Sequence, residues 1–249
     1  MKGWSVVYRR ELAGLFLSPL AWILFCLTLF YNGFFFLHYL ENVTAGEVNE
    51  ALMLLLGGAW PFWLLVMFLP PLLTMRMISE ESRSGLLEFL LTAPVGDGAV
   101  VTGKALAATT FMTLVWTCLP IYGLVLWLVG APPDWGVVAS AWLGAVLVSA
   151  LFSAVGLAAS ALSSTPLLAA FLATLANVVL VFLPLLGSTA RGVRAETLKR
   201  ALGKLDVMSH FQGSFQTGAL DSAHLVFYVA WTGVFLFLTV RLIERHRWL

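Results

Sequence analysis

The chain has 249 residues, of which 60% are hydrophobic and only 11% charged, and its formal net charge is +1. Soluble domains carry roughly 25% charged residues, so the composition excludes an ordinary soluble fold. Each helix that crosses a bilayer needs roughly 20 apolar residues, and this length accommodates about six of them with loops. The apolar runs are long and continuous, unlike the short alternating strands of a membrane barrel. We therefore expect an all-α membrane protein with six transmembrane helices, and the near-neutral charge gives no reason to expect a nucleic-acid partner.

The first segment, residues 2–17, has its apolar side chains near one face at helical spacing, with Lys2 and Glu11 largely elsewhere. This pattern predicts a helix that lies in the membrane interface. We expect no removable signal peptide, because charges run through the first dozen residues without a following cleavage site. The side chains expected at the interface are Trp4, Tyr8, Arg9 and Arg10.

Six apolar runs follow, and two longer polar segments, residues 76–98 and 188–222, separate some of them. Pro70 and Pro71 predict a bend in the second run, and Pro120 interrupts the third, because proline removes a backbone donor from the helix. The predicted spans are residues 19–40, 52–75, 99–129, 137–162, 167–186 and 225–243.

Lys and Arg placement predicts the orientation of these spans, since cytoplasmic loops are enriched in both residues. The loops after the first and third spans have neither residue and are expected outside. One segment conflicts with this rule, because six spans also place residues 188–222 outside with five basic residues. A re-entrant fifth span would only move the conflict to the C-terminus. We expect both termini in the cytoplasm, together with nine basic residues: Lys2, Arg9, Arg10, Arg76, Arg83, Lys104, Arg241, Arg245 and Arg247.

The nine basic residues in that list share one predicted side of the membrane, because they lie in the N-terminal segment, at or beside the loop after the second span, and at the C-terminus. Their common placement is the reason for expecting both termini in the cytoplasm. The protein is expected in a bacterial inner membrane.

One motif resembles a nucleotide site. Residues 98–105, from Gly98 to Ala105, fit the phosphate-loop pattern except that Ala105 replaces the Ser or Thr that binds magnesium. A phosphate loop also needs a strand before it, whereas this segment opens a membrane helix, where Lys104 is expected to extend its amine to the interface. We therefore expect this chain to bind no cofactor, and any ATP to be hydrolysed by another chain.

Away from the span ends, where Lys104 and Arg241 lie, the expected spans contain no Asp, Glu, Lys or Arg, whereas ion-coupled carriers place such groups in the membrane. Asn32 and Asn177 are expected to form interhelical hydrogen bonds, and the small residues Gly156, Ser160 and Ser164 to pack against another helix. The histidines share no ligand spacing, so neither a metal site nor His-based catalysis is indicated: His38, His210, His224 and His246.

Residues 76–98 form the most informative loop, because they combine charges with a short apolar run, Leu86 to Leu91. The apolar side chains of this run need cover. A helix that rests on lipid headgroups would provide it, and so would a helix that docks onto a cytoplasmic protein. Both alternatives stay open on composition alone.

Three stretches of the chain resemble the membrane subunits of ABC-2-type exporters, in particular the gliding-motility-associated and copper-enzyme-maturation permease group. They are residues 74–94 with Gly103 and Lys104, residues 160–170, and the part from His210 to Trp248. Leu86 departs from the group, where a polar residue is common, and so does the basic segment 188–222.

This resemblance implies two copies of a six-span subunit, each bound to a cytoplasmic ATPase chain that holds ATP and Mg²⁺. Residues 84–92 would be the coupling helix, whose movement the kinked second span passes on. The residues implied in contact with the ATPase are Glu80, Glu81, Arg83, Gly85, Leu87, Glu88, Leu90, Leu91, Thr92 and Pro94.

Residues 188–222 are expected to cap the exit of the pathway or to contact an extracytoplasmic partner protein. The chain as a whole is expected to be the permease subunit of an exporter, which moves substrate or transmits conformational change. An ion-coupled or autonomous carrier and a membrane-embedded enzyme are the alternatives. The residues expected at the outer partner are Arg194, Lys199, His210, Phe211 and Phe215.

Overall fold

The computed structural model describes residues 3–42, 48–85, 96–189 and 202–246. All regular secondary structure in these ranges is helical, and six helices are long and apolar enough to cross a membrane. The prediction of an all-α membrane protein with six spans is therefore confirmed.

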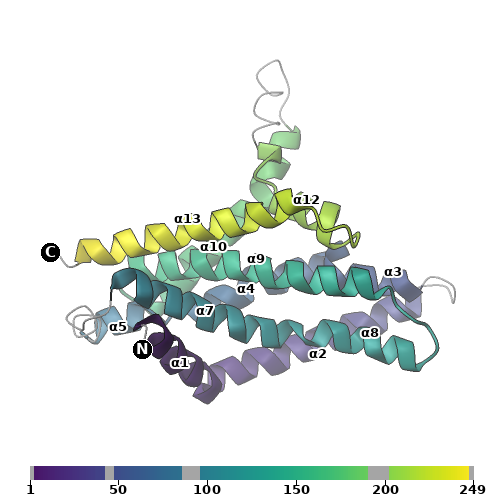
Figure 1. The fold of residues 1–249 in the computed structure, drawn as a ribbon, viewed down its shortest axis with the longest axis horizontal. Helices are drawn as coiled ribbons and strands as arrows, with labels where there is room; N and C mark the ends of the chain where they lie inside the picture. Colours follow the sequence, from purple (N-terminus) through teal and green to yellow (C-terminus); the bar gives the residue numbers. More distant parts are fainter. Residues whose placement is uncertain (1–2, 43–47, 86–95, 190–201, 247–249) are drawn as a thin grey trace.

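The helices pack side by side into one elongated bundle (Figure 1). Two single turns of wider π-helical winding, η1 (Leu54–Gly58) and η2 (Phe211–Phe215), join the regular helices. The regular helices are α1 (Gly3–Leu17), α2 (Pro19–Asn42), α3 (Val48–Met53), α4 (Trp60–Thr74), α5 (Ser79–Arg83), α7 (Asp97–Trp116), α8 (Cys118–Leu128), α9 (Trp135–Leu162), α10 (Pro166–Thr189), α12 (Val207–His210) and α13 (Ser222–His246).

Helix α9 is the centre of the bundle. It contacts α4, α7, α8, α10 and α13, and its second half is buried on every side. Small side chains make this possible, because Ala, Gly and Ser let neighbouring backbones approach closely. Helices α2 and α13 are mostly exposed instead, with large apolar side chains such as Phe30 and Phe237 on their surfaces. Their outward faces are suited to lipid or to another membrane chain.

The second span is interrupted near its start. Gly57 has φ +113° and Ala59 is extended, so α4 begins anew at Trp60. Helix α4 then continues through Pro70 and Pro71 to Thr74. The bend expected at the two prolines stays a prediction. The interruption depends on the left-handed conformation that Gly57 adopts without a Cβ clash.

Two asparagines show how polar groups are used inside the bundle. Pro71 has no N–H for the carbonyl of Met67, and Asn177 from α10 donates its Nδ2 to that oxygen at 3.2 Å. The predicted interhelical role of Asn177 is confirmed. Asn32 instead donates to the carbonyl of Thr28 in its own helix, at 2.9 Å, so the same prediction was wrong for Asn32.

The third span divides into α7 and α8 at Thr117, as Pro120 predicts, because Pro120 cannot donate to the carbonyl of Trp116. After α8 the chain turns, and Asp134 begins α9 by accepting a hydrogen bond from the amide of Gly136 at 2.8 Å. Such N-caps satisfy amides that have no partner within the helix.

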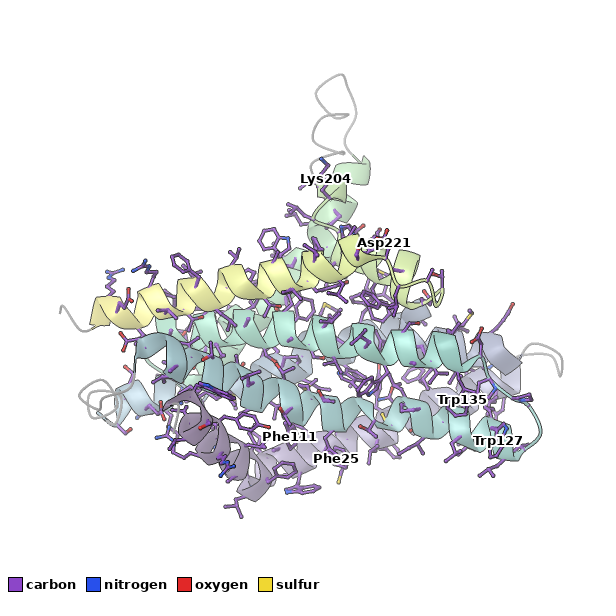
Figure 2. The ribbon with its side chains drawn as sticks, viewed as in Figure 1. Phe25, Phe111, Trp127, Trp135, Lys204 and Asp221 are labelled. Carbon is purple, nitrogen blue, oxygen red and sulfur yellow. The ribbon has the colours of Figure 1, made fainter. Side chains whose placement is uncertain are left out.

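The two ends of the bundle differ in chemistry. Helix α1, helix α5 and the last turns of α13 lie together at one end, which we call the α5 end (Figure 1). Trp127 and Trp135 lie at the opposite end, where α8 and α9 meet, and are 54% and 45% exposed (Figure 2). Exposed Trp side chains of this kind are typical of a membrane interface.

Candidate functional site

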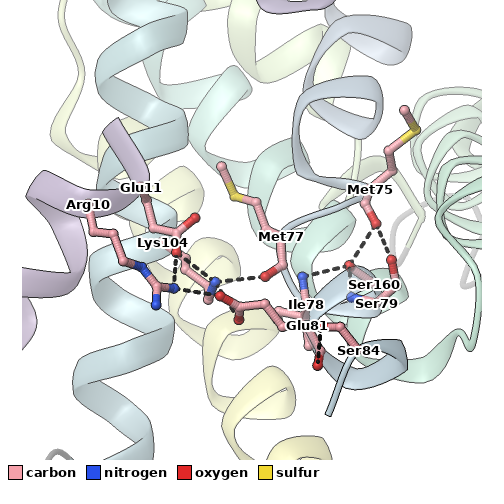
Figure 3. Close-up of polar contacts among 10 residues, drawn as sticks. All are labelled: Arg10, Glu11, Met75, Met77, Ile78, Ser79, Glu81, Ser84, Lys104 and Ser160. Carbon is pink, nitrogen blue, oxygen red and sulfur yellow. Dashed lines mark hydrogen bonds and ion pairs between the residues drawn. The ribbon is translucent and has the colours of Figure 1, made fainter. Parts of the chain in front are cut away.

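Four charged side chains from three helices meet at the α5 end. Helix α1 contributes Arg10 and Glu11, α5 contributes Glu81, and α7 contributes Lys104 (Figure 3). We call these four residues the charge cluster. Two of the ion-paired residues, Glu11 and Lys104, are 93 residues apart in sequence. The packing of α1 against α7 brings them together.

A glycine allows that packing. A Cβ at Gly103 would lie 2.9 Å from Cβ of Val7 and 3.0 Å from the carbonyl oxygen of Trp4. Because Gly103 has no side chain, α1 can lie directly on α7, and Glu11 then faces Lys104, the residue after the glycine. Replacing Gly103 with any larger residue would push the two helices apart.

The amine of Lys104 has three partners. Its Nζ lies 2.9 Å from Oε1 of Glu11 and donates a 2.7 Å hydrogen bond to the carbonyl oxygen of Met77. Nζ also lies 2.8 Å from Oε2 of Glu81. These two atoms form an ion pair, but their geometry is not that of a hydrogen bond. Arg10 bonds Oε1 of both Glu11 and Glu81. Two cations therefore face two carboxylates, and the charge cluster is neutral overall.

Three of the four side chains in the charge cluster are largely buried, and breaking a buried ion pair is costly. The side chain of Lys104 is 0% exposed, those of Glu11 and Glu81 are 14% exposed, and that of Arg10 is 44% exposed. Although partial burial works in the opposite direction, hydrogen bonds and attraction from Glu11 and Glu81 raise the pKa of Arg10 above its ordinary value. Arg10 therefore stays a cation, and a carboxylate that lost Lys104 would still face it.

Two predictions are corrected by this arrangement. Lys104 does not extend to the interface, because its amine is enclosed by the carboxylates and by the carbonyl of Met77. Glu11 does not lie away from the apolar face of α1, because it falls between the buried residues Val7 and Leu15 at a spacing of four residues. That spacing places all three on one face of a helix.

A second set of polar contacts attaches the turn between α4 and α5 to α9. Oγ of Ser160 accepts hydrogen bonds from the amides of Ile78 at 3.2 Å and Ser79 at 3.0 Å. The same hydroxyl donates to the carbonyl oxygen of Met75 at 3.0 Å (Figure 3). Helix ends leave such backbone groups without hydrogen-bond partners. Here the side chain of Ser160 from α9 is the partner.

Part of α5 stays free on the surface. Glu80 is exposed, its side chain 60%, and pairs only loosely with Arg76 at 4.0 Å. Arg83 is also exposed, and Gly85 ends the helix with φ +73°. Glu81 faces inward and is ion-paired within the chain, and its contact with an ATPase stays a prediction. The other residues expected in that contact lie outside the described residues: Leu87, Glu88, Leu90, Leu91, Thr92 and Pro94.

A cavity of about 480 Å³ lies beside the charge cluster, between α1, α2, α4 and α5. Its lining combines charged groups, among them Arg76 and Glu80, with apolar side chains such as Leu15 and Leu73. A cavity with this lining is able to receive a side chain that carries both an apolar stem and a polar end.

The residues predicted at the membrane interface are partly exposed. Trp4 is 39% exposed and Arg9 is exposed, whereas Tyr8 is half-buried and its hydroxyl lies 3.2 Å from Oγ1 of Thr110 on α7. Contact of α1 with lipid headgroups stays a prediction.

The described part of the segment predicted outside the membrane contains buried aromatic residues. Phe211 and Phe215 are both 0% exposed and pack within the chain, Phe211 against Phe62 and Trp63. Their contact with an outer partner stays a prediction. His210 is half-buried, and its Nδ1 lies 2.6 Å from Nδ1 of His224. Arg194 and Lys199 lie outside the described residues.

Among the residues that the structure describes, no three His, Cys, Asp or Glu side chains gather in a way that could hold a metal ion. Cys26 and Cys118 are both free thiols.

Comparison with protein families gives one finding. The model of the ABC-2 type transporter family matches residues 1–184, which include α1, the charge cluster, the α4–α5 turn and α9. A comparison with curated proteins gave no match. The family match does not distinguish the gliding-motility and copper-enzyme-maturation group, which stays a prediction.

Proposed function

Because the chain belongs to the ABC-2 type transporter family, as the permease component of an ABC-type transporter, we propose that a separate cytoplasmic ATPase drives it through α5 and the loop that follows. The observation that supports this proposal is that α5 has both exposed charges and an inward-facing, ion-paired carboxylate. Glu80 and Arg83 are exposed for contact with a partner, while Glu81, between them, is ion-paired to α1 and α7.

The charge cluster explains how force on α5 would reach the membrane helices. Moving α5 alone would withdraw Glu81 from Lys104 and Arg10 and leave a buried amine with fewer partners. Removing one partner of a buried ion pair costs about 3–5 kcal/mol. It is therefore less costly for α1 and α7 to follow α5, and ATP-driven displacement becomes a rigid-body shift of several helices.

Charge placement supports a cytoplasmic location of the α5 end. Of the nine basic residues expected inside, seven are described, and they belong to α1, α5, the first turns of α7, the last turns of α13 or the turn before α5: Arg9, Arg10, Arg76, Arg83, Lys104, Arg241 and Arg245. Cytoplasmic ends of membrane proteins are enriched in Lys and Arg. This orientation, in a bacterial inner membrane, exposes α5 to the compartment where ATP is available.

The proposed assembly has two ATPase chains and two permease chains, with ATP and Mg²⁺ bound by the ATPase. The exposed apolar faces of α2 and α13 offer surface for a second permease copy as well as for lipid. The complex would act as an exporter or would transmit conformational change to an extracytoplasmic protein. Deleting residues 192–205 should then impair export or capture of that protein while ATPase assembly is spared.

The test is copurification from the native host, with tagged permease in mild detergent, mass spectrometry and an ATPase assay. Glu80→Arg with Arg83→Glu changes the exposed charges of α5 and leaves the charge cluster intact, and Glu88→Arg with Leu91→Arg changes the loop. Glu244→Arg is the matched control, because Glu244 is a partly exposed carboxylate at the same end, on α13.

We expect an ATPase chain to copurify with the unchanged permease and with Glu244→Arg, and to be lost or to lose stimulation in the α5 and loop variants. Permease that purifies alone and without ATPase activity would contradict the proposal. So would an ATPase that stays bound and stimulated in both pairs of substitutions.

A further inference from the structure

Helix α9 meets the α4–α5 turn at a close contact. A Cβ at Gly156 would lie 2.1 Å from Oγ1 of Thr74, so the glycine allows the end of α4 to lie against α9. One turn further, Ser160 makes its hydrogen bonds to Met75, Ile78 and Ser79. Glycine and serine together therefore fix the turn on α9.

The same pair of residue types recurs near the other end of α9. A Cβ at Gly144 would lie 2.7 Å from atoms of both Phe211 and Phe215 in η2. Ser140, one turn earlier, donates its hydroxyl to the carbonyl oxygen of Phe215 at 2.7 Å. Again a glycine admits the neighbouring segment and a serine bonds its backbone.

The segment at this second contact is itself connected to the interruption of the second span. The ring of Phe211 lies against Gly57, where a Cβ would be 2.3 Å from its Cε1. Gln216 donates to the carbonyl oxygen of Met53 at 3.3 Å. We call η1 and η2 together the outer layer, since both lie away from the α5 end.

Between the two contacts α9 is a single unbroken helix, whereas α4 begins only after η1, and α7 ends at Trp116. Ser140 and Ser160 are 20 residues apart, which is about 30 Å along a helix. Most of α9 is enclosed by other helices, which limits the room it has to bend.

We propose that α9 transmits movement of α5 to the outer layer, with Ser160 and Ser140 as the positioning residues at its two ends. This rests on the proposed function, in which the ATPase moves α5, and it replaces the second span as the transmitting element. The interruption at Gly57 separates that span into two parts, whereas α9 contacts both the α4–α5 turn and η2 directly.

Hydrogen–deuterium exchange on the purified permease in lipid nanodiscs tests this without an ATPase. Ser160→Ala removes the acceptor of two amides, those of Ile78 and Ser79, and we expect their exchange to rise about five- to tenfold. The informative result is distant: exchange of residues 207–216 should also rise, by about twofold or more. Because coupling is reciprocal, Ser140→Ala should raise exchange in residues 75–84.

Ser153→Ala is the matched control. Ser153 lies on α9 between the two contacts, is 0% exposed, and its hydroxyl has no hydrogen-bond partner among the described residues. It should leave exchange at both ends unchanged. Changes confined to the contact nearest each substitution, or a uniform rise throughout the bundle, would overturn the proposal.

A second measurement separates this inference from the proposed function. With the ATPase bound, a nucleotide that is not hydrolysed should change exchange of residues 207–216 in the unchanged permease, and Ser160→Ala should abolish that change while the ATPase still copurifies. A retained response would refute transmission by α9 alone. Loss of the ATPase from the unchanged permease would refute the proposed function instead.

Discussion

Replacing Lys104 with methionine tests whether the charge cluster stabilises the fold. Methionine has a similar length but no charge, so Lys104→Met keeps most of the packing and removes the contacts to Glu11, Glu81 and the carbonyl of Met77. The cluster then has one cation, Arg10, for two carboxylates that are each 14% exposed. Breaking a buried pair in this way costs about 3–5 kcal/mol, and the partial exposure of both carboxylates favours the lower figure.

Thermal unfolding in detergent, followed by intrinsic fluorescence of the 10 Trp residues, measures this cost. For a chain of this size, 1 kcal/mol corresponds to about 2–4 °C, so the Tm of Lys104→Met should fall by about 6–12 °C. Adding Glu11→Gln restores neutrality and should recover part of the loss. Arg241→Met is the control, because its ion pair with Glu244 is exposed and should contribute less than about 1 kcal/mol.

A Tm for Lys104→Met within about 2 °C of the unchanged chain would refute the reasoning. The same conclusion would follow if Arg241→Met and Lys104→Met lowered the Tm equally. In either case the cluster could not be what makes α1 and α7 follow α5.

Two further predictions concern backbone positions. Asn177→Ala leaves the buried carbonyl of Met67 without a partner and should lower the free energy of unfolding by about 1–2 kcal/mol. This loss should be smaller in a Pro71→Ala background, where the restored amide can bond that carbonyl. Equal losses in the two backgrounds, measured by thermal unfolding, would contradict this account. Gly57→Ala should cost about 2 kcal/mol or more, because φ is +113° and Phe211 fills the space. Gly14→Ala, in a helix with nothing within 4 Å of the added Cβ, should be neutral or stabilising, and similar losses for both glycines would contradict the steric argument.

The spans could be predicted from sequence because their cause is local. An apolar run long enough for the bilayer becomes a helix whatever surrounds it. The last span, predicted at residues 225–243, lies within α13 (Ser222–His246). The break at Thr117 was also predictable, since Pro120 removes a backbone donor whatever its neighbours are.

The charge cluster could not be predicted in the same way, because it depends on which helices become neighbours. Nothing local to Lys104 reveals that Glu11 will face it from α1. One signal was available: Glu11 lies between Val7 and Leu15, on the face that a helix with this pattern would bury. A charged residue in such a stripe indicates a buried partner of opposite charge.

The polar contacts of the second span share one physical origin. Its α5 end loses backbone hydrogen bonds at Pro71 and in the turn after Thr74, in surroundings that offer little water. Three side chains make up the deficit: Asn177 bonds Met67, Ser160 bonds Met75, and Lys104 bonds Met77. Because these donors come from α10, α9 and α7, satisfying the backbone also attaches the segment to three different helices. A displacement of α5 is therefore shared among them, and the polar groups that the backbone requires for stability are the same groups that would carry movement into the bundle.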